Sequence, residues 1–426
     1  MMKVTIEQIG SKIIFHLNPN SSDLEYLQTS SVELAGRNTS IDLRGESLEN
    51  IHPDLIGLST ILMCHPFVGK ELELPVMVSE AFFESANKVI SKYKISSETD
   101  SSIVPYSPPV RARPALAFSG GADSSAALSV MPGNTIPIFM NRPMKRWSIY
   151  DSDAPLANCG KLREIGFDVQ IIDCDLEYLR KPVGFPSDLA HAIPSILLAN
   201  SLGLDSIAFG TVMESAYGIG HERYKDYPSG AHRRFYGSLM EAAGLMLSLP
   251  VSGISEVGTS IINDKSPLGD FSQSCIRGKR DEPCLRCWKC FRKRLLSHAL
   301  FGTKIDIDKM ISKNKEVAAK LSGYPISHEN VLAYSIQNVE GKDDDFIQRL
   351  RNRLDISSDL EFLEYWYSPS INLVPEKYRV TVKQKISKFL PTMTKEHERT
   401  FKDWNMEDFL LTDSTKRAQK ILKSLF

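Results

Sequence analysis

The spacing of apolar and polar residues changes along the chain and predicts three units. Residues 1–110 begin with alternating apolar positions on either side of Gly10 and Ser11, which predicts a β-hairpin, and continue with two helical patterns. Short apolar runs and helical stretches alternate over residues 111–300, whereas residues 301–426 show mainly amphipathic helical spacing. We therefore expect an N-terminal α+β unit, a central α/β unit and a C-terminal helical unit.

The central unit has the pattern of a parallel sheet. Strand-length apolar runs and helical stretches follow one another: the runs are 115–118, 135–140, 168–174 and 205–212, and the helical stretches are 155–165 and 187–201. Such alternation predicts a sheet with helices on both faces. A Ser- and Pro-rich linker, residues 96–110, leads into this unit. Ligands of these sheets bind beyond the carboxyl ends of the strands, so a polar and aromatic loop at 217–228 is a candidate substrate pocket or lid.

The first apolar run of the central unit leads into a loop of small residues, Ser119-Gly120-Gly121-Ala122-Asp123-Ser124, and then into a helical pattern. The two glycines allow a chain reversal and a close approach that a Cβ would block. The start of the next helix offers unpaired N–H groups and the positive end of the helix dipole. A Gly-Gly turn alone is weak evidence, but in this strand-to-helix setting the loop is a candidate anion cradle.

Four of the seven cysteines form one cluster, Cys275, Cys284, Cys287 and Cys290. The C-x-x-C spacing lets two thiolates on a tight turn reach the same ion, and the other cysteines complete a closed tetrahedral site. Four protein ligands leave no open position, so we expect a structural metal. Zinc is the first candidate, and an iron–sulfur cluster is the alternative that cysteine ligands leave open.

Basic residues are concentrated around this cluster. They can offset the negative charge of four thiolates, or they can form a patch for an anionic substrate or RNA, and we favour the first interpretation for most of them. The residues are Arg277, Lys279, Arg280, Arg286, Lys289, Arg292, Lys293 and Arg294.

Composition narrows the functional class. The 426 residues are 42% hydrophobic and 24% charged with a net charge of -1, which is typical of a globular protein and gives no overall positive charge for binding nucleic acid. No apolar run is long enough to span a membrane, and the first residues lack a signal-peptide pattern. Seven cysteines in so long a chain do not form a disulfide framework. We therefore expect a cytoplasmic protein with neither a membrane nor a nucleic-acid partner.

The Ser-Gly-Gly loop resembles the pyrophosphate loop of the N-type ATP pyrophosphatases, which split ATP into AMP and pyrophosphate to activate a substrate. It lacks the Gly-Lys-Ser/Thr ending of a Walker loop. The resemblance implies a Rossmann-like parallel sheet of the adenine nucleotide alpha hydrolase (HUP, PP-loop) type that uses ATP and Mg²⁺. It implies catalytic roles for Asp123, which would position magnesium or the helix start, and for Ser124. The implied ATP-binding residues are Ser119, Gly120, Gly121, Asp123, Ser124, Ser125, Gly210, and Phe139 and Met140, which either lend backbone groups to the adenine or belong to the core.

The loop and the cysteine cluster together resemble the 7-cyano-7-deazaguanine synthase (QueC) family over about residues 111–300. In that family the matching cysteines hold zinc. The enzyme adenylates a carboxylate on a deazapurine, ammonia displaces AMP to give an amide, and a second ATP-dependent round dehydrates the amide to a nitrile. Two segments depart from the family pattern: Phe185-Pro186-Ser187-Asp188 stands where Pro-Gly-Arg-Asn is usual, and Tyr227-Pro228-Ser229 stands in place of Tyr-Pro-Asp.

The units at both ends have no counterpart in a simple synthase, and the long chain is similar to the QatC-type proteins of antiphage defence operons. This resemblance implies that a deazaguanine carboxylate is activated and joined to the amino terminus of a partner protein. Our first hypothesis is therefore ATP-dependent activation of 7-carboxy-7-deazaguanine for transfer to an amine. The alternatives are nitrile synthesis, tRNA thiolation, and a nucleotide-binding module without catalysis. The added units would dock a protein acceptor or form a homodimer.

Overall fold

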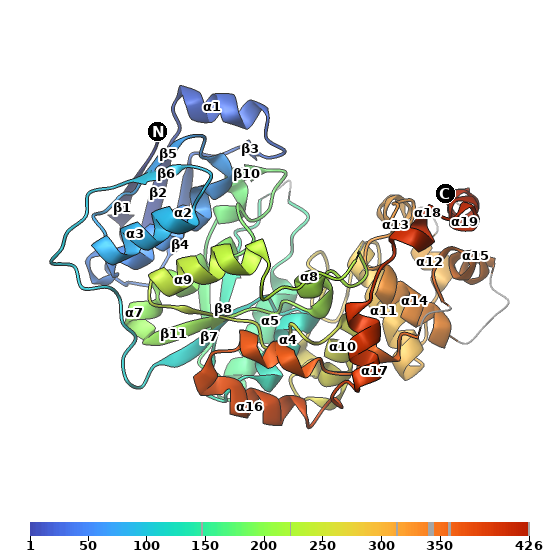
Figure 1. The fold of residues 1–426 in the computed structure, drawn as a ribbon. Helices are drawn as coiled ribbons and strands as arrows, with labels where there is room; N and C mark the ends of the chain where they lie inside the picture. Colours follow the sequence, from blue (N-terminus) through green and yellow to red (C-terminus); the bar gives the residue numbers. More distant parts are fainter. Residues whose placement is uncertain (146–147, 222, 312–313, 340–344, 357–358, 425–426) are drawn as a thin grey trace.

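The computed structural model describes residues 1–426 except 146–147, 222, 312–313, 340–344, 357–358 and 425–426. Figure 1 shows an N-terminal region with its own sheet, a central parallel sheet, and a helical region that holds the C-terminus. Among the described residues, no helix is long and apolar enough to cross a membrane.

The N-terminal region is built on a mixed sheet in the order β4-β2-β1-β5-β6. Its strands are β1 (Met2–Ile9), β2 (Lys12–Asn18), β4 (Asn38–Asp42), β5 (Glu71–Glu73) and β6 (Lys94–Ser96). β1 and β2 pair antiparallel across Gly10 and Ser11, which confirms the predicted hairpin. Two helices of this region, α2 (Pro53–Cys64) and α3 (Glu80–Val89), pack against helices of the central region.

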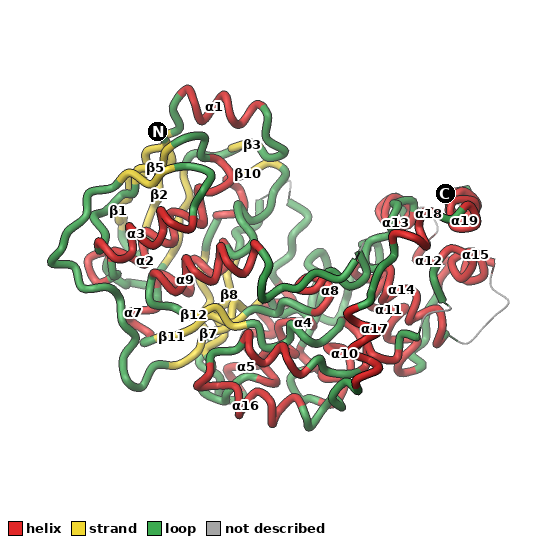
Figure 2. The backbone as a smooth tube through the Cα atoms, viewed as in Figure 1, coloured by secondary structure: helices red, strands yellow, loops and turns green. Residues whose placement is uncertain are grey.

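The central sheet is entirely parallel and has the order β12-β11-β7-β8-β9. Its strands are β7 (Arg113–Phe118), β8 (Ile136–Asn141), β9 (Gln170–Asp173), β11 (Leu204–Ala208) and β12 (Met246–Ser248). Numbered from β7, the strand order is that of a Rossmann-like sheet, which confirms the predicted parallel α/β architecture. Figure 2 shows these strands as a group separate from the N-terminal strands.

Helices cover both faces of the central sheet. Along β7, Ala115 and Ala117 pack with the core shared by α6 (Ile193–Leu197) and α9 (Ser238–Ala242), whereas Leu116 and Phe118 belong to a second core. The helices that contribute to this second core are α4 (Ala122–Val130), α5 (Asp153–Glu164), α10 (Glu256–Lys265) and α16 (Glu376–Ile386). Burial on both faces explains why β7 is apolar throughout.

One predicted helix is wrong in its extent. Residues 187–201 do not form a continuous helix: a 3₁₀ turn at Ala190–Ala192 precedes α6, and α7 (Ala199–Leu202) follows it. Pro194 lies in the first turn of α6. Because proline lacks an N–H group and its ring clashes with the preceding turn, it suits the start of a helix and not the interior.

The C-terminal region is helical, as the sequence pattern predicts. Its principal helices are α11 (Trp288–Phe301), α13 (Lys315–Leu321), α14 (Glu329–Asn338), α15 (Asp345–Arg353), α17 (Lys395–Lys402) and α19 (Asp413–Lys423). α14 packs on α11 and α15, and α19 packs on α13 and α15. Between these helices the chain returns to the central region, where α16 packs against α4. The C-terminal region therefore shares its packing with the central sheet.

Candidate nucleotide and metal sites

The Ser-Gly-Gly loop (residues 119–124) turns from β7 into α4 at the carboxyl edge of the central sheet. Gly120 has a φ of +72°, and a Cβ there would lie 3.1 Å from Pro155. Ser124 Oγ lies 3.0 Å from Ser119 Oγ and donates a hydrogen bond to the Gly121 carbonyl. Gly121 gives α4 no side-chain cap, so the N–H groups of its first turn depend on other partners.

A cavity of about 450 Å³, the loop cavity, opens beside this loop. Its lining includes the predicted residues Ser119, Gly121, Asp123, Ser124, Phe139, Met140 and Gly210. A Cβ on Gly210 would lie 2.9 Å from the Ser124 backbone nitrogen, so a glycine lets the chain after β11 meet the start of α4. The volume falls in the range of roughly 300–1,000 Å³ that is usual for small-molecule sites.

Two predicted nucleotide-binding residues do not line the loop cavity. Ser125 is buried in α4, where its N–H donates to the Gly121 carbonyl over 3.0 Å. Gly120 shapes the loop through its left-handed conformation, and its carbonyl accepts hydrogen bonds from Gln273 N at 3.0 Å and Asn158 Nδ2 at 3.1 Å. Both residues therefore support the loop from behind.

One end of the loop cavity is aromatic. The His191 ring lies between Phe185 and Phe209, with ring centroids 5.1 Å apart on each side. Burial lowers the pKa of His191 to about 4, so its imidazole is neutral at pH 7. Within the described part of the chain, His191 Nδ1 is buried and has no hydrogen-bond partner. This end of the cavity therefore suits a planar ring with a polar edge.

An ion pair contributes a polar wall to the same cavity. Arg142 Nη1 lies 2.9 Å from Glu177 Oε2, and the Arg142 guanidinium lies 4.2 Å from the centroid of the Tyr150 ring. These residues and His191 come from segments far apart in the sequence, and no local motif marks them.

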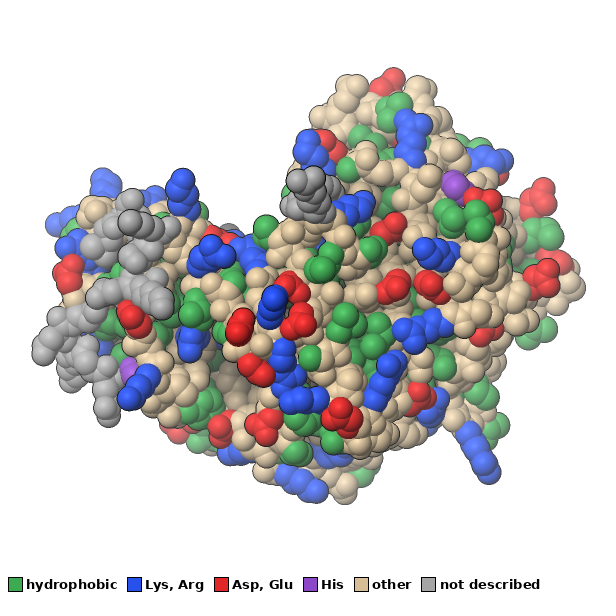
Figure 3. Space-filling view, turned by 180° about the vertical axis from the view of Figure 1, so that it is seen from behind, with side chains coloured by type: hydrophobic (Ala, Val, Ile, Leu, Met, Phe, Trp, Pro, Cys, Tyr) green, Lys and Arg blue, Asp and Glu red, His purple; other side chains and the backbone are tan. Residues whose placement is uncertain are grey.

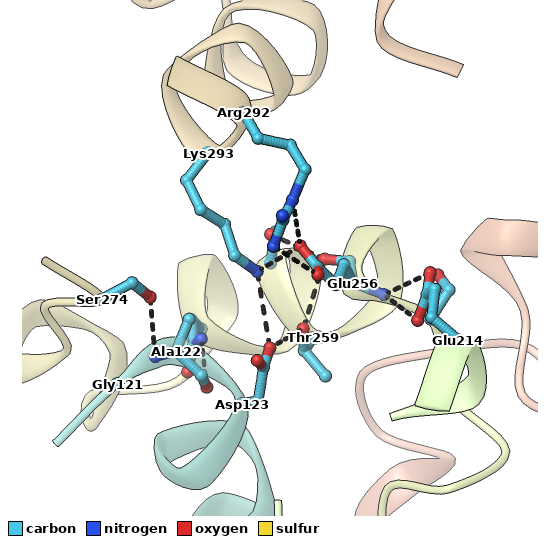
Figure 4. A network of polar contacts seen from close by, with 12 residues as sticks. Gly121, Ala122, Asp123, Glu214, Glu256, Thr259, Ser274, Arg292 and Lys293 are labelled. Carbon is cyan, nitrogen blue, oxygen red and sulfur yellow. Dashed lines mark hydrogen bonds and ion pairs between the residues drawn. The ribbon is translucent and has the colours of Figure 1, made fainter. Parts of the chain in front are cut away.

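Asp123 connects the Ser-Gly-Gly loop to a buried ionic network, which Figure 4 shows. Its Oδ1 accepts a hydrogen bond from Thr259 Oγ1 at 3.0 Å and lies 3.4 Å from Lys293 Nζ. Lys293 also lies 3.1 Å from Glu256 Oε2, and Arg292 pairs with the same carboxylate at 2.7 Å. Both contacts to Asp123 use Oδ1, while its side chain lines the loop cavity.

A second carboxyl group, Glu214, lies behind Glu256. The Glu256 backbone N–H donates to Glu214 at 3.1 Å, and Asn330 Nδ2 donates at 2.9 Å. Burial, with the nearby charge of Glu256, raises the pKa of Glu214 to about 7. Burial also acts to raise the pKa of Glu256, but Lys293 and Arg292 outweigh it and lower the pKa to about 2. Near neutral pH one carboxyl group is charged and the other is partly protonated.

The four predicted metal ligands come together. The Sγ atoms of Cys275, Cys284, Cys287 and Cys290 all lie within 4.8 Å of one another, and those of Cys284 and Cys290 are 3.9 Å apart. Cys287 is the N-cap of α11, and its sulfur accepts a hydrogen bond from the Cys290 N–H. Thiolates at about 2.3 Å from one tetrahedral zinc ion would be about 3.8 Å apart. The cluster could therefore bind zinc.

The basic residues near the cysteines have several different partners. Arg292 and Lys293 pair with Glu256, and Arg277 pairs with Glu316, so these three have carboxylate partners of their own. Among the described residues, Lys289 and Arg294 make no ion pair and no side-chain hydrogen bond. These ion pairs do not test whether the basic residues also offset the charge of the thiolates, so that expectation stays a prediction.

A second cavity of about 470 Å³, the α10–α11 cavity, lies between the loop and the cysteine cluster. Lys289, Lys293 and Arg294 line it together with Asp264 and Asp270. Ala122, Ser274 and Lys289 line both this cavity and the loop cavity. The two cavities therefore adjoin at the start of α4.

None of the described residues in the polar and aromatic loop at 217–228 lines the loop cavity. Tyr217 packs against Phe401 with ring centroids 5.3 Å apart, and the Tyr224 N–H donates to the Trp404 carbonyl at 2.8 Å. Glu222 of this loop lies outside the described residues. These contacts join the loop to the C-terminal region and differ from the expected lid.

The two segments that depart from the synthase pattern meet each other. His232 lies 3.4 Å from the Asp188 carboxylate and 2.9 Å from the Tyr227 hydroxyl. Of these segments, Phe185 reaches the loop cavity. His232 therefore connects the two segments, next to the aromatic end of the loop cavity.

Sequence reasoning did not select Ser274, Thr259 or Lys293 for the nucleotide site. Ser274 Oγ accepts the Ala122 N–H at 3.2 Å, and the other two contact Asp123. Only the positions of Ser274 and Lys293 in the sequence could have indicated them, because Ser274 directly precedes a cysteine ligand and Lys293 lies one helical turn beyond Cys290.

In a comparison with known protein families, residues 235–405 match a family of unknown function, DUF6395. The matched segment contains the four cysteines, Glu256 and Lys293, and ends at Asn405, which leaves the Ser-Gly-Gly loop outside it. No curated protein and no solved structure matches the chain.

Proposed function

We propose that this protein uses ATP to activate a carboxylate, releases pyrophosphate, and passes the acyl group to an amine. The observation that carries the proposal is the Ser-Gly-Gly loop, which opens on a nucleotide-sized cavity at the carboxyl edge of a Rossmann-like sheet. Its place between β7 and α4 supports the PP-loop (HUP) type of fold. Helix N–H groups and the hydroxyls of Ser119 and Ser124 are suitable donors for phosphate oxygens.

The proposed chemistry has two transfers. A carboxylate oxygen attacks the α-phosphorus of ATP, the bond to the bridging α–β oxygen breaks, and pyrophosphate leaves. The amine nitrogen then attacks the acyl carbon of the adenylate, AMP leaves with the bonding electrons, and the nitrogen loses a proton. Loop donors that stabilise the developing phosphate charge are worth roughly 3 kcal/mol each in comparable sites.

Magnesium would neutralise phosphate charge when it is bound. Asp123 is the residue placed to hold it, because both of its described contacts use Oδ1 and its side chain lines the loop cavity. Lys293 would keep this carboxylate in a fixed orientation. Carboxylate oxygen is the ligand type that Mg²⁺ prefers.

The α10–α11 cavity is a suitable exit for pyrophosphate. It adjoins the loop at Ala122 and Ser274, and the side chains of Lys289 and Arg294 have no carboxylate partner in the described structure. Unpaired cations next to a phosphate-binding loop attract the departing anion.

The aromatic end of the loop cavity supports a planar heteroaromatic acid as substrate, and we propose 7-carboxy-7-deazaguanine. Phe185 and Phe209 flank the neutral His191 ring, and these rings offer a flat surface against which a planar heteroaromatic substrate can stack. The backbone near Phe139 and Met140 remains for the adenine.

The acceptor that we propose is an amine of a partner protein, as in antiphage defence, with nitrile synthesis as the alternative. Purified protein with ATP and 7-carboxy-7-deazaguanine should release pyrophosphate, and Asp123→Ala should abolish release. Mass spectrometry of co-expressed neighbouring gene products should then show an added deazapurine mass. Formation of 7-cyano-7-deazaguanine with unmodified partners would favour the synthase, and release of ADP and phosphate would contradict the proposal.

The remaining alternatives make different predictions. A nucleotide-binding module would bind ATP and show no turnover with any carboxylate. A tRNA thiolation enzyme would bind tRNA with a steep salt dependence. Acidic and basic side chains are interspersed on the molecular face in Figure 3, and that face shows no extended basic surface. The net charge of -1 supports a small-molecule substrate over tRNA.

For the cysteine cluster we propose one structural zinc ion. The Sγ separations fit four thiolates on a single ion. Elemental analysis should give one zinc per chain, and Cys290→Ser should lower this ratio. Cys159→Ser is the matched control, because Cys159 is a buried free cysteine outside the cluster. Iron and sulfide in the purified protein would contradict zinc.

A further inference from the structure

The segment that carries the first metal ligand also holds the Ser-Gly-Gly loop. Gln273 N donates to the Gly120 carbonyl at 3.0 Å, and Ser274 Oγ accepts the Ala122 N–H at 3.2 Å. The next residue is Cys275. Two consecutive residues before a metal ligand thus fix the middle of the loop and the first N–H group of α4.

A second connection reaches the loop from the chain between Cys275 and Cys284. Arg280 Nη1 donates to Asn158 Oδ1 at 2.7 Å, and Asn158 Nδ2 donates to the Gly120 carbonyl at 3.1 Å. Asn158 is almost fully buried. Gly120 is the loop residue in the left-handed conformation, so both connections hold the carbonyl group at which the loop turns.

The helix that contains Cys290, α11, provides a third connection. Lys293 lies on α11 three residues after Cys290 and contacts Asp123 Oδ1 at 3.4 Å. Figure 4 shows Lys293 and Ser274 approaching the start of α4 from two sides. The position of α11 therefore sets the position of the Asp123 carboxylate.

The segment between Cys275 and Cys284 has little regular structure of its own. Between Cys275 and Cys284 the chain forms turns and one isolated bridge, and Gln273 Nε2 and Oε1 hydrogen-bond to Lys279 O at 2.9 Å and Asp281 N at 3.0 Å. A metal ion that joins the four thiolates would close this short loop and fix it against α11.

We propose that the metal on the four cysteines orders the Ser-Gly-Gly loop, so that metal and nucleotide bind with positive coupling. The inference rests on nucleotide binding by that loop, as in the proposed function. It assigns Ser274 and Lys293 as positioning residues that act through Ala122 and Asp123. Coupling is reciprocal, so bound nucleotide should tighten metal binding by the same factor.

The test measures binding and does not depend on turnover. Affinity for a non-hydrolysable ATP analogue is measured by calorimetry on the full chain, before and after removal of the metal with a chelator, with circular dichroism to confirm folding. We expect removal to weaken binding about tenfold, within the roughly 5- to 150-fold range of typical couplings, and Zn²⁺ to restore it. Competition with a zinc-binding dye should show tighter zinc binding when the analogue is present.

If the metal-free chain unfolds, the Ser274→Ala variant still tests the contact between the metal-binding segment and the Ser-Gly-Gly loop. Ser274→Ala preserves all four thiolates, so it should retain one zinc per chain and bind the analogue several-fold more weakly. Ser91→Ala, an exposed serine without a described side-chain contact, is the control and should match the wild type. Equal analogue affinity of the folded chain with and without metal, or of zinc-loaded Ser274→Ala and wild type, would overturn the coupling alone. Absence of analogue binding to the zinc-loaded wild type would overturn the proposed function as well.

Discussion

Lys293 Nζ lies 3.4 Å from Asp123 Oδ1 and joins α11, the helix that begins within the cysteine cluster, to the first turn of α4. The same ammonium group lies 3.1 Å from Glu256, whose side chain is 3% exposed. Burial acts to lower the pKa of Lys293, but Asp123 and Glu256 reverse the effect and raise it, so this side chain stays charged. One cation thus serves both the candidate ATP site and the core.

Lys293→Met should be strongly destabilising, because it leaves two carboxylates without this cation and one of them is buried. We expect the free energy of unfolding to fall by about 3 kcal/mol. Denaturant unfolding followed by circular dichroism measures the change. The control is Lys402→Met, which removes an exposed pair with Glu398 and should cost less than about 1 kcal/mol. Equal costs for the two variants would contradict the role of Lys293.

Gly210→Ala should disturb the proposed nucleotide site from the side of β11. The added methyl group would lie 2.9 Å from Ser124 N and 3.0 Å from the Asp123 carbonyl carbon, both of them backbone atoms. The end of β11 must then move away from the loop, at a cost of about 1–3 kcal/mol in stability. Affinity for an ATP analogue, measured by calorimetry, should fall about fivefold if roughly half of that strain acts on the loop.

Gly133→Ala is the control for this substitution, since nothing lies within 4 Å of the position of its Cβ. It should leave analogue affinity unchanged. Wild-type affinity in Gly210→Ala would show that the contact between β11 and α4 does not shape the binding site.

The sequence predicted a structural feature correctly where residues close together in the chain determine that feature. The predicted apolar run 115–118 lies within β7, and the alternating pattern on either side of Gly10 and Ser11 matches the β1–β2 hairpin. Both were predictable because successive side chains of a strand point to opposite faces of its sheet, so the sequence itself shows which faces are buried. The cysteine cluster was also predictable, since three of its four ligands lie within seven residues of one another. β12 was not predicted, because three residues are too few to show a period.

The parts that could not be predicted depend on contacts between distant segments. Asp123 and Lys293 are 170 residues apart in the chain, and nothing in the basic run near the cysteines distinguishes Lys293 from its neighbours. Lys293 meets Asp123 only because α10 and α11 pack against the Ser-Gly-Gly loop. His191 is a comparable case, because its place in the loop cavity follows from the break before α6 that the helical pattern concealed.

Arg294→Gln should weaken the binding of pyrophosphate and leave AMP binding unchanged. Arg294 lines the α10–α11 cavity and not the loop cavity, so it can reach the leaving group without contacting the adenylate. Loss of one charge-assisted contact should raise the Kd of magnesium pyrophosphate about tenfold. Calorimetry with magnesium pyrophosphate and with AMP separates the two effects.

Arg111→Gln is the matched control, because Arg111 is exposed and lines neither cavity. It should bind both ligands as the wild type does. An unchanged pyrophosphate Kd in Arg294→Gln would exclude this cavity as the exit for the leaving group.

Glu214 should make the stability of the protein depend on pH. Burial and the charge of Glu256 raise its folded-state pKa from 4.5 to about 7, so the folded chain holds a proton that the unfolded chain releases. This contribution is fully present below pH 4.5 and is lost as the pH rises through about 7. It is on the order of 3 kcal/mol across that window.

Glu214→Gln should remove this dependence, because a neutral amide cannot release the proton and its oxygen can still accept hydrogen bonds from Glu256 N and Asn330. The free energy of unfolding of wild type and variant is compared by urea denaturation between pH 4.5 and 8. As the pH rises, the free energy of unfolding of Glu214→Gln should increase relative to that of the wild type. The control Glu84→Gln, at an exposed position, should show the same pH dependence as the wild type. Burial lowers the pKa values of His191 and His328 to about 4, so these residues make the protein more stable as the pH rises, opposite to Glu214. Both histidines are present in wild type and variant, so comparing the two proteins separates the contribution of Glu214. A constant difference over this range would show that Glu214 is charged in the folded protein and that the ionic network tolerates two adjacent carboxylates.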